Sequence, residues 1–154
     1  MEINGLKIRR AELKDIRRLA EIERACFRDG YSEEILAFFL MSPEHICLVA
    51  EVGGIIIGMT IGELELEENG SLVGHVWTIE VIGPYRRKGI GTLLLSKLEE
   101  ILRERGAREC YLEVRTDNKP AIRLYEKMGY ELICLLQDYY GPGKNGFLMK
   151  KRLI

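Results

Sequence analysis

The sequence lacks the features that mark membrane, secreted and zinc-binding proteins. Its 154 residues contain no run of about 18 apolar residues, so neither a transmembrane helix nor a membrane partner is expected. The N-terminal residues show no basic-then-apolar signal pattern. The four cysteines are far apart and form no C-x-x-C pair, which favours buried free thiols over disulfides or zinc. These absences predict a cytoplasmic protein in a reducing compartment, with no bound metal.

The chain also carries almost no net charge. The formal charge of −1 excludes the broadly basic surface that nucleic-acid binding requires, so no nucleic-acid partner is expected. With 47% hydrophobic and 31% charged residues, the composition is typical of a globular protein. No linker, repeat or low-complexity segment interrupts the chain, and the sequence therefore predicts one domain over residues 1–154.

Hydrophobic periodicity predicts an α/β fold. Gly53-Gly54 indicates a hairpin turn. An acidic loop is predicted at residues 65–70, and His45 is also expected to lie in a loop. The expected architecture is a mostly antiparallel sheet followed by a βαβ unit. Strands are predicted at 6–10, 47–52, 55–64, 72–82, 110–115, 132–136 and 147–153, and helices at 16–26, 32–40, 92–104 and 121–128.

The most informative segment joins a predicted strand to a predicted helix. The strand ends at Ile82, and Arg86-Arg87-Lys88 and Gly89-Ile90-Gly91 follow before the helix. Bare backbone N–H groups at a helix N-terminus bind phosphate, because the helix dipole also favours an anion there. No lysine follows the second glycine, which excludes a P-loop, and Leu94 replaces the third glycine of a dinucleotide fingerprint. The segment predicts a site for a phosphorylated ligand, with a solvated charge run as the alternative.

Arg86-x-x-Gly89-x-Gly91 resembles the acetyl-CoA pyrophosphate loop of the GNAT acetyltransferases. Residues 111–130, which begin Tyr111-Leu112-Glu113, are similar to the second half of that family's cofactor site. Asp138-Tyr139-Tyr140 and Phe147-Leu148-Met149 resemble the protein N-terminal acetyltransferase branch, which includes archaeal enzymes and the ribosomal-protein alanine acetyltransferases. The resemblance implies the GNAT fold: a mixed, mostly antiparallel sheet of about six or seven strands, with a central splayed parallel pair and flanking helices.

The resemblance implies acetyl-CoA as the acetyl donor and CoA as the product. The pyrophosphate would lie on backbone N–H groups of residues 87–92, where glycine permits close approach. The Val81 N–H would bind the thioester carbonyl and stabilise the oxyanion formed there. Asn118 would cap the following helix or contact the cofactor arm. The residues implied to bind the cofactor are Ile79, Val81, Arg86, Arg87, Lys88, Gly89, Ile90, Gly91, Thr92, Asn118 and Tyr125.

Three residues acquire catalytic roles by the same resemblance. Glu113 lies on a strand face with Arg115 and would be the general base, acting directly or through water; a surface carboxylate paired with Arg115 is the alternative. Tyr125 would give a proton to the departing CoA thiolate, and its alternative is a core tyrosine. His75 would be a second base or hold a water molecule, and its alternative is a structural histidine.

The acceptor site is implied to lie between residues 27–32 and 139–145. Substrate contacts are expected from Tyr31, Glu80, Tyr139 and Tyr140. At both walls the residues depart from the branch pattern: Arg28-Asp29-Gly30-Tyr31 replaces a Pro-aromatic pair, and Lys144-Asn145 replaces an acidic pair.

Acid–base chemistry favours an α-amine as acceptor. Only a neutral amine attacks a thioester; at pH 7 an α-amine of pKa about 7.7–8.0 needs roughly 1 kcal/mol, but lysine of pKa about 10.4 nearer 4–5 kcal/mol. No cysteine has a base partner on the cofactor side, so direct attack in a ternary complex is expected. We predict an enzyme, active as a monomer or homodimer, that acetylates protein or peptide N-termini. The alternatives are a small-amine or lysine acetyltransferase and a non-catalytic acyl-CoA sensor.

Overall fold

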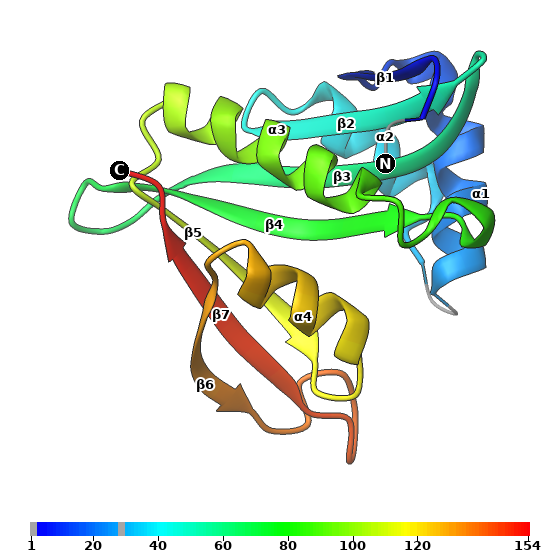
Figure 1. The fold of residues 1–154 in the computed structure, drawn as a ribbon. Helices are drawn as coiled ribbons and strands as arrows, with labels where there is room; N and C mark the ends of the chain where they lie inside the picture. The colour runs from blue at the N-terminus through cyan, green and yellow to red at the C-terminus, as the bar shows by residue number, and fades with distance from the viewer. Residues whose placement is uncertain (1–2, 28–29) are drawn as a thin grey trace. The chain divides into compact units, whose positions relative to one another are not determined.

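The predicted strands form one seven-stranded sheet, with the order β1-β2-β3-β4-β5-β7-β6 (Figure 1). The structure is a computed structural model that describes residues 3–27 and 30–154. The sheet is mostly antiparallel, and β4 and β5 are parallel, as the sequence predicts. Its strands are β1 (Leu6–Arg10), β2 (His45–Val52), β3 (Ile55–Leu66), β4 (Leu72–Val81), β5 (Glu109–Arg115), β6 (Glu131–Leu136) and β7 (Gly146–Arg152); its α-helices are α1 (Ile16–Cys26), α2 (Glu33–Met41), α3 (Ile90–Glu104) and α4 (Lys119–Lys127).

The chain divides into two compact units. Unit 1 comprises Met1–Glu63 with Thr78–Leu98, and unit 2 comprises Leu64–Trp77 with Glu99–Ile154. Strands β3 and β4 and helix α3 each continue from one unit into the other. The expectation of a single domain stays a prediction.

In unit 1 the sheet has helices on both faces. Helices α1 and α2 pack on one face, where Leu19, Ile22 and Phe39 share a core with alternate residues of β2 and β3. The start of α3 packs on the opposite face, and a methyl group added at Gly62 would lie 2.7 Å from Leu98. Glycine at this position therefore lets the helix approach the strand closely.

Local signals in unit 1 act as predicted. The Ser32 hydroxyl caps α2 by accepting the Ile35 N–H at 3.2 Å. Gly53 and Gly54 turn the β2–β3 hairpin with φ of 58° and 81°, a conformation that favours glycine.

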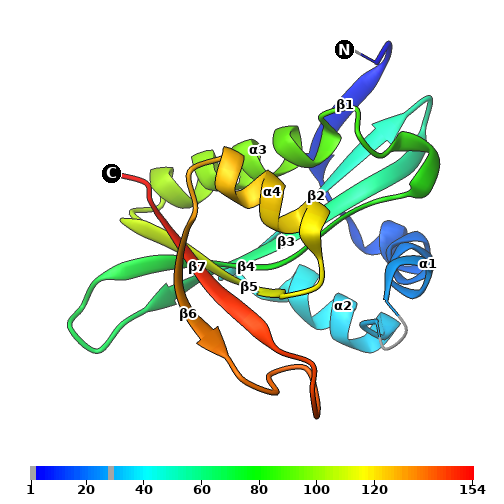
Figure 2. The same cartoon turned by 60° about the horizontal axis from the view of Figure 1, so that its bottom comes forward.

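In unit 2 the strand β5 lies between β4 and β7, and α4 lies beside this part of the sheet (Figures 1 and 2). The parallel ladder runs from Val73 opposite Glu109 to Val76 opposite Leu112. A buried polar group stabilises the unit: Glu99 accepts the Tyr130 hydroxyl and the Lys151 ammonium, each at 2.8 Å. Because Glu99 is 3% exposed, both of its oxygens need these partners.

Three sequence expectations need correction. His45 is not a loop residue: it begins β2, is buried, and stacks on Phe39 with ring centroids 4.6 Å apart. Glu65 is not in a loop either, since β3 continues to Leu66. Helix α3 begins at Ile90, two residues before the predicted start at Thr92 and directly after Gly89, whose φ of 82° lies outside the helical range.

The cysteines are free, as predicted, but not all are buried. Cys47 and Cys110 are buried, Cys26 is half-buried and Cys134 is exposed. Cys134 lies on β6, which is an edge strand, and this position explains its exposure. Burial raises the pKa of Cys47 and of Cys110 to about 12, so these two thiols are poor nucleophiles at neutral pH.

Candidate active site

The phosphate loop predicted from the sequence lies in unit 1, immediately before α3. Arg87 and Gly89 have φ of 63° and 82°, so this segment turns through left-handed conformations before the helix begins. A methyl group at Gly89 would meet no atom within 4 Å, and the space beside the loop is therefore open. The first-turn N–H groups of a 15-residue helix and exposed Arg86, Arg87 and Lys88 give the loop the chemistry that a pyrophosphate needs.

Arg86 links this loop to the end of β4. Its Nε donates to the Val81 carbonyl at 2.8 Å, and its Nη2 lies 3.6 Å from the Cys26 sulfur at the end of α1. The guanidinium therefore fixes the peptide plane that follows Val81. The contacts of Arg86 and Val81 with a cofactor stay predictions.

Glu80 is a buried carboxylate next to Val81. Its side chain accepts the Thr78 hydroxyl through Oε1, and Oε2 has no hydrogen-bond partner among the residues that the structure describes. The Thr78 carbonyl in turn accepts the Thr60 hydroxyl at 2.9 Å. Glu80 Oε2 is therefore available to accept a hydrogen bond at the end of β4, where the sequence predicts contacts with the substrate.

Glu23 on α1 is a candidate that the sequence reasoning missed. It is 2% exposed; Oε1 accepts the Tyr31 N–H at 3.2 Å, while Oε2 has no hydrogen-bond partner within residues 3–27 and 30–154. Burial raises the pKa of Glu23 to about 7. Glu23 lies at helical spacing from Leu19 and Ala20, so the sequence places a charged residue on the apolar side of a helix. That signal would have identified Glu23 as a candidate.

The Glu23 contact fixes the chain at Tyr31, in the predicted acceptor wall. The Tyr31 ring packs edge-on against Phe39 at 5.4 Å, and a methyl group at Gly30 would lie 2.9 Å from the backbone of Glu23. Arg28 and Asp29 of the same wall lie outside the described residues.

The buried Glu23 carboxyl predicts that stability falls as pH rises. Its ordinary pKa of 4.5 applies to the unfolded chain, which therefore loses the proton before the folded protein does. The resulting loss of unfolding free energy develops between about pH 4.5 and about pH 7 and amounts to about 3 kcal/mol. Glu23→Gln should remove this loss, which urea unfolding at pH 5 and pH 8 measures.

Glu21→Gln is the matched control, because Glu21 is exposed on the same helix, where its carboxylate pairs with Arg18 at 3.2 Å. It should keep the pH dependence of the parent protein. A Glu23→Gln variant that loses stability with pH in parallel with the parent would contradict the prediction.

Unit 2 brings together two of the three predicted catalytic residues. His75 Nε2 lies 2.7 Å from Glu113 Oε1, and His75 is 5% exposed. Alternation along β5 buries Cys110, Leu112 and Val114 and leaves the Glu113 face less buried, as predicted. Arg115 pairs with Asp117 at 2.8 Å instead of with Glu113. Glu113 is therefore a base candidate with a histidine partner.

The other predicted residues of unit 2 surround the end of β5. Tyr139 and Tyr140 are exposed and pack edge-on, with centroids 4.9 Å apart. Burial and the nearby Glu113 carboxylate raise the pKa of Tyr139. The Asn118 side chain accepts the Ala121 N–H at 3.3 Å, which confirms its predicted role as a helix cap.

Tyr125 is buried against Tyr130, with ring centroids 5.8 Å apart. Burial, with a smaller effect of Tyr140, raises the pKa of Tyr125, so its hydroxyl stays protonated at neutral pH. A protonated hydroxyl suits a proton donor, and its role stays a prediction.

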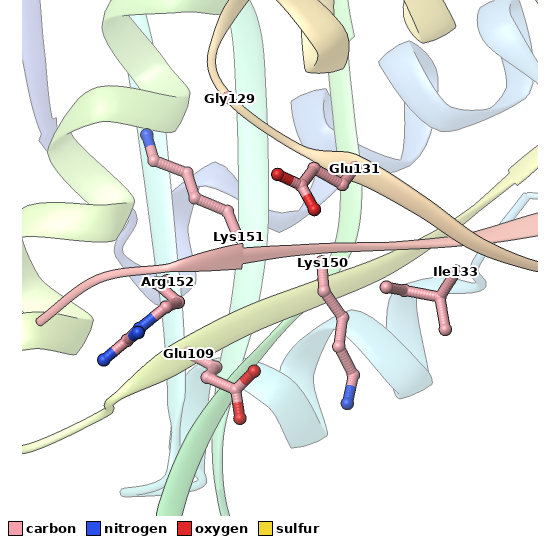
Figure 3. A pocket seen from close by; sticks show the side chains of 7 residues that line it. All are labelled: Glu109, Gly129, Glu131, Ile133, Lys150, Lys151 and Arg152. Carbon is pink, nitrogen blue, oxygen red and sulfur yellow. The ribbon is translucent and has the colours of Figure 1, made fainter.

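A hollow of about 390 Å³ lies in unit 2 (Figure 3). Lys150 and Lys151 point to opposite sides of β7 there, as neighbours on a strand do. Its charges are of both signs, and it contains none of the predicted site residues, so it is not the candidate active site. It is lined by Glu109, Gly129, Glu131, Ile133, Lys150, Lys151 and Arg152.

Comparison with known proteins identifies the family to which this fold and loop belong. The model of the acetyltransferase (GNAT) family matches residues 16–130. The chain therefore belongs to the GNAT family, whose members are acetyltransferases with acetyl-CoA as donor, and this confirms the predicted fold, enzyme class and cofactor. Among the described residues, every helix is too short or too polar to span a membrane.

Individual relatives are protein N-terminal acetyltransferases. The chain is 37% identical to an N-alpha-acetyltransferase of Sulfurisphaera tokodaii, over 93% of this chain and 90% of that protein. It is 28% identical to the NAA10 catalytic subunit of the N-terminal acetyltransferase A complex of Arabidopsis thaliana, over 95% and 77% of the two chains. The structure of Ard1 from Thermoplasma volcanium superposes with a TM-score of 0.86 at 25% identity, over 97% and 99% of the two chains.

Proposed function

We propose that this protein transfers the acetyl group of acetyl-CoA to the N-terminal α-amine of a protein or peptide. The observation that carries the proposal is the Glu113 carboxylate, held 2.7 Å from buried His75 on a half-exposed strand face. The archaeal and plant relatives named for N-terminal acetylation support the α-amine as acceptor.

Different residues of the chain have different roles in the reaction. When bound, acetyl-CoA supplies an activated thioester. The loop before α3 binds the pyrophosphate, and the Val81 N–H binds the thioester carbonyl oxygen. Glu113 takes a proton from the substrate ammonium, and Tyr125 gives a proton to the leaving sulfur. A C–N bond forms, the C–S bond breaks, and the products are an N-acetyl amide and CoA thiol.

Carboxylates and tyrosines provide the acceptor contacts in this proposal. Glu80, with one unpartnered oxygen among the described residues, attracts the substrate ammonium. Exposed Tyr139 and Tyr140 provide flat surfaces for the first residues of the peptide. A single carboxylate base suits an α-amine, since the amine's pKa of about 7.7–8.0 leaves only a small free-energy cost at neutral pH.

The acceptor is tested by measuring thiol release from acetyl-CoA with different amines. We expect turnover with peptides that carry a free N-terminus and much lower rates with lysine peptides and polyamines. The same peptides with an acetylated N-terminus are the matched control, and mass spectrometry locates the added acetyl group. Turnover with polyamines alone would support the small-amine alternative, and CoA binding with no turnover on any amine would support the sensor alternative.

A further inference from the structure

His75 has a carboxylate on each of its two ring nitrogens. Nε2 lies 2.7 Å from Glu113 Oε1, and Nδ1 lies 3.3 Å from Glu65 Oε2. The contact of Nε2 with Glu113 is a hydrogen bond. The contact of Nδ1 with Glu65 is within ion-pair distance, but it does not have the geometry of a hydrogen bond. Nδ1 is therefore buried beside the Glu65 charge without a hydrogen bond to it. The inference that follows rests on the proposed function, since it concerns how the Glu113–His75 pair works.

The two carboxylates constrain the protons on the imidazole. A carboxylate only accepts, and a neutral imidazole has one N–H, so it can satisfy one of these contacts and not both. A hydrogen on Nδ1 is favoured by the Glu65 charge, whereas a bare lone pair on Nδ1 would face that charge. With Nδ1 protonated, the short Nε2–Glu113 contact must hold one further proton.

Tyr111 holds both Glu65 and the imidazole in place. Its hydroxyl donates to Glu65 Oε1 at 2.5 Å, while its ring stacks on His75 with centroids 4.4 Å apart and planes 4° apart. His75 and Tyr111 are direct neighbours in the parallel β4–β5 ladder, so the strand pairing sets this stack. Trp77 lies against the same imidazole, with centroids 4.4 Å apart.

We propose that Glu65 and Tyr111 are positioning residues that keep His75 Nδ1 protonated, so that His75 and Glu113 share one proton and act as a single base. In this unit Glu113 receives the proton that the substrate amine loses, and the Glu65 charge offsets the positive charge on the imidazole. The proton returns to solvent after the amide has formed. Neither Glu65 nor Tyr111 touches the substrate.

The protonation state of His75 can be measured without any assay of activity. The chain has two histidines, so the imidazole nitrogens of ¹⁵N-histidine-labelled protein give two sets of NMR signals, which His75→Gln assigns. We expect a protonated Nδ1 at neutral pH in the parent protein. In Glu65→Gln the hydrogen on Nδ1 should no longer be favoured, so the Nδ1 signal should move toward that of an unprotonated nitrogen, and the His45 signals should not change.

Two further variants separate positioning from folding. Tyr111→Phe keeps the stacked ring and removes the hydroxyl, so it should shift the His75 signals in the same direction by a smaller amount. Glu68→Gln makes the same chemical change as Glu65→Gln at an exposed position three residues further along the chain, and it should leave the His75 signals and the rate unchanged.

The kinetic result distinguishes the inference from the proposed function. Glu65→Gln should lower kcat by about tenfold to a hundredfold, leave KM for acetyl-CoA unchanged and move the pH–rate profile. Unchanged His75 signals and kinetics in Glu65→Gln would overturn the inference while the function stands. A parent protein with no turnover on any amine would refute the proposed function, and the NMR signals would then still decide whether Glu65 sets the state of His75.

Discussion

Glu113→Gln is expected to lower kcat by about 10²- to 10⁴-fold with little change in KM for acetyl-CoA. Glutamine has the shape of glutamate and can still contact His75, but it cannot take a proton from the substrate ammonium. The remaining activity should depend on amine that is already neutral, so the pH–rate profile should move upward, toward the pKa of an α-amine at about 7.7–8.0. The measurement is kcat and kcat/KM for a peptide from about pH 6 to about pH 10.

Glu109→Gln is the control for this substitution. Glu109 lies four residues earlier on β5, on the same strand face, and outside the candidate site. Its variant should retain the rate and profile of the parent protein. An unchanged pH–rate profile in Glu113→Gln would remove Glu113 as the base.

Lys151→Met is expected to lower the free energy of unfolding by about 3 kcal/mol, because it leaves the Glu99 carboxylate buried without its cation. Lys151 Nζ lies 2.8 Å from Glu99 Oε1, and the side chains of the two residues are 22% and 5% exposed. The Tyr130 hydroxyl, which donates to the other oxygen, cannot replace a charge. Urea unfolding at neutral pH measures the effect, and we expect a lower melting temperature as well.

Lys150→Met is the matched control, because Lys150 is the neighbour of Lys151 on β7 and points to the other side of the strand (Figure 3). It should change stability by less than about 1 kcal/mol. Adding Glu99→Gln to Lys151→Met should recover part of the loss, since no unpaired charge then remains buried. Equal losses in Lys151→Met and Lys150→Met would contradict the role assigned to the buried pair.

Most elements of the fold could be predicted from the sequence, because their signals are local. Ser32 caps α2, Asn118 caps α4, and Gly53-Gly54 turns a hairpin, each through contacts within a few residues. Errors occurred where the local signal was ambiguous. Glu65 follows two strand residues but precedes acidic turn residues, and only its pairing in the sheet extends β3 through it.

The candidate site could be predicted in part. The loop at Arg86–Gly91 is continuous in the sequence, and so is the alternation that turns Glu113 away from the core. The contacts of His75 with Glu113 and of Tyr111 with Glu65 join residues 38 and 46 positions apart, which no local pattern relates. Glu23 had a local signal in its helical spacing with Leu19 and Ala20, but its contact with the Tyr31 N–H had none.

The sequence by itself determined the order of the elements, the glycine turn before α3 and the residue types available for acid–base chemistry. These follow from backbone preferences and from periodicities of two and 3.6 residues, which act over a few positions. Only the tertiary structure decided which side chains are partners. Strand pairing brings Tyr111 beside His75, and packing of α1 removes Glu23 from water. A carboxylate acquires its protonation and its role from such neighbours, and they come from distant parts of the chain.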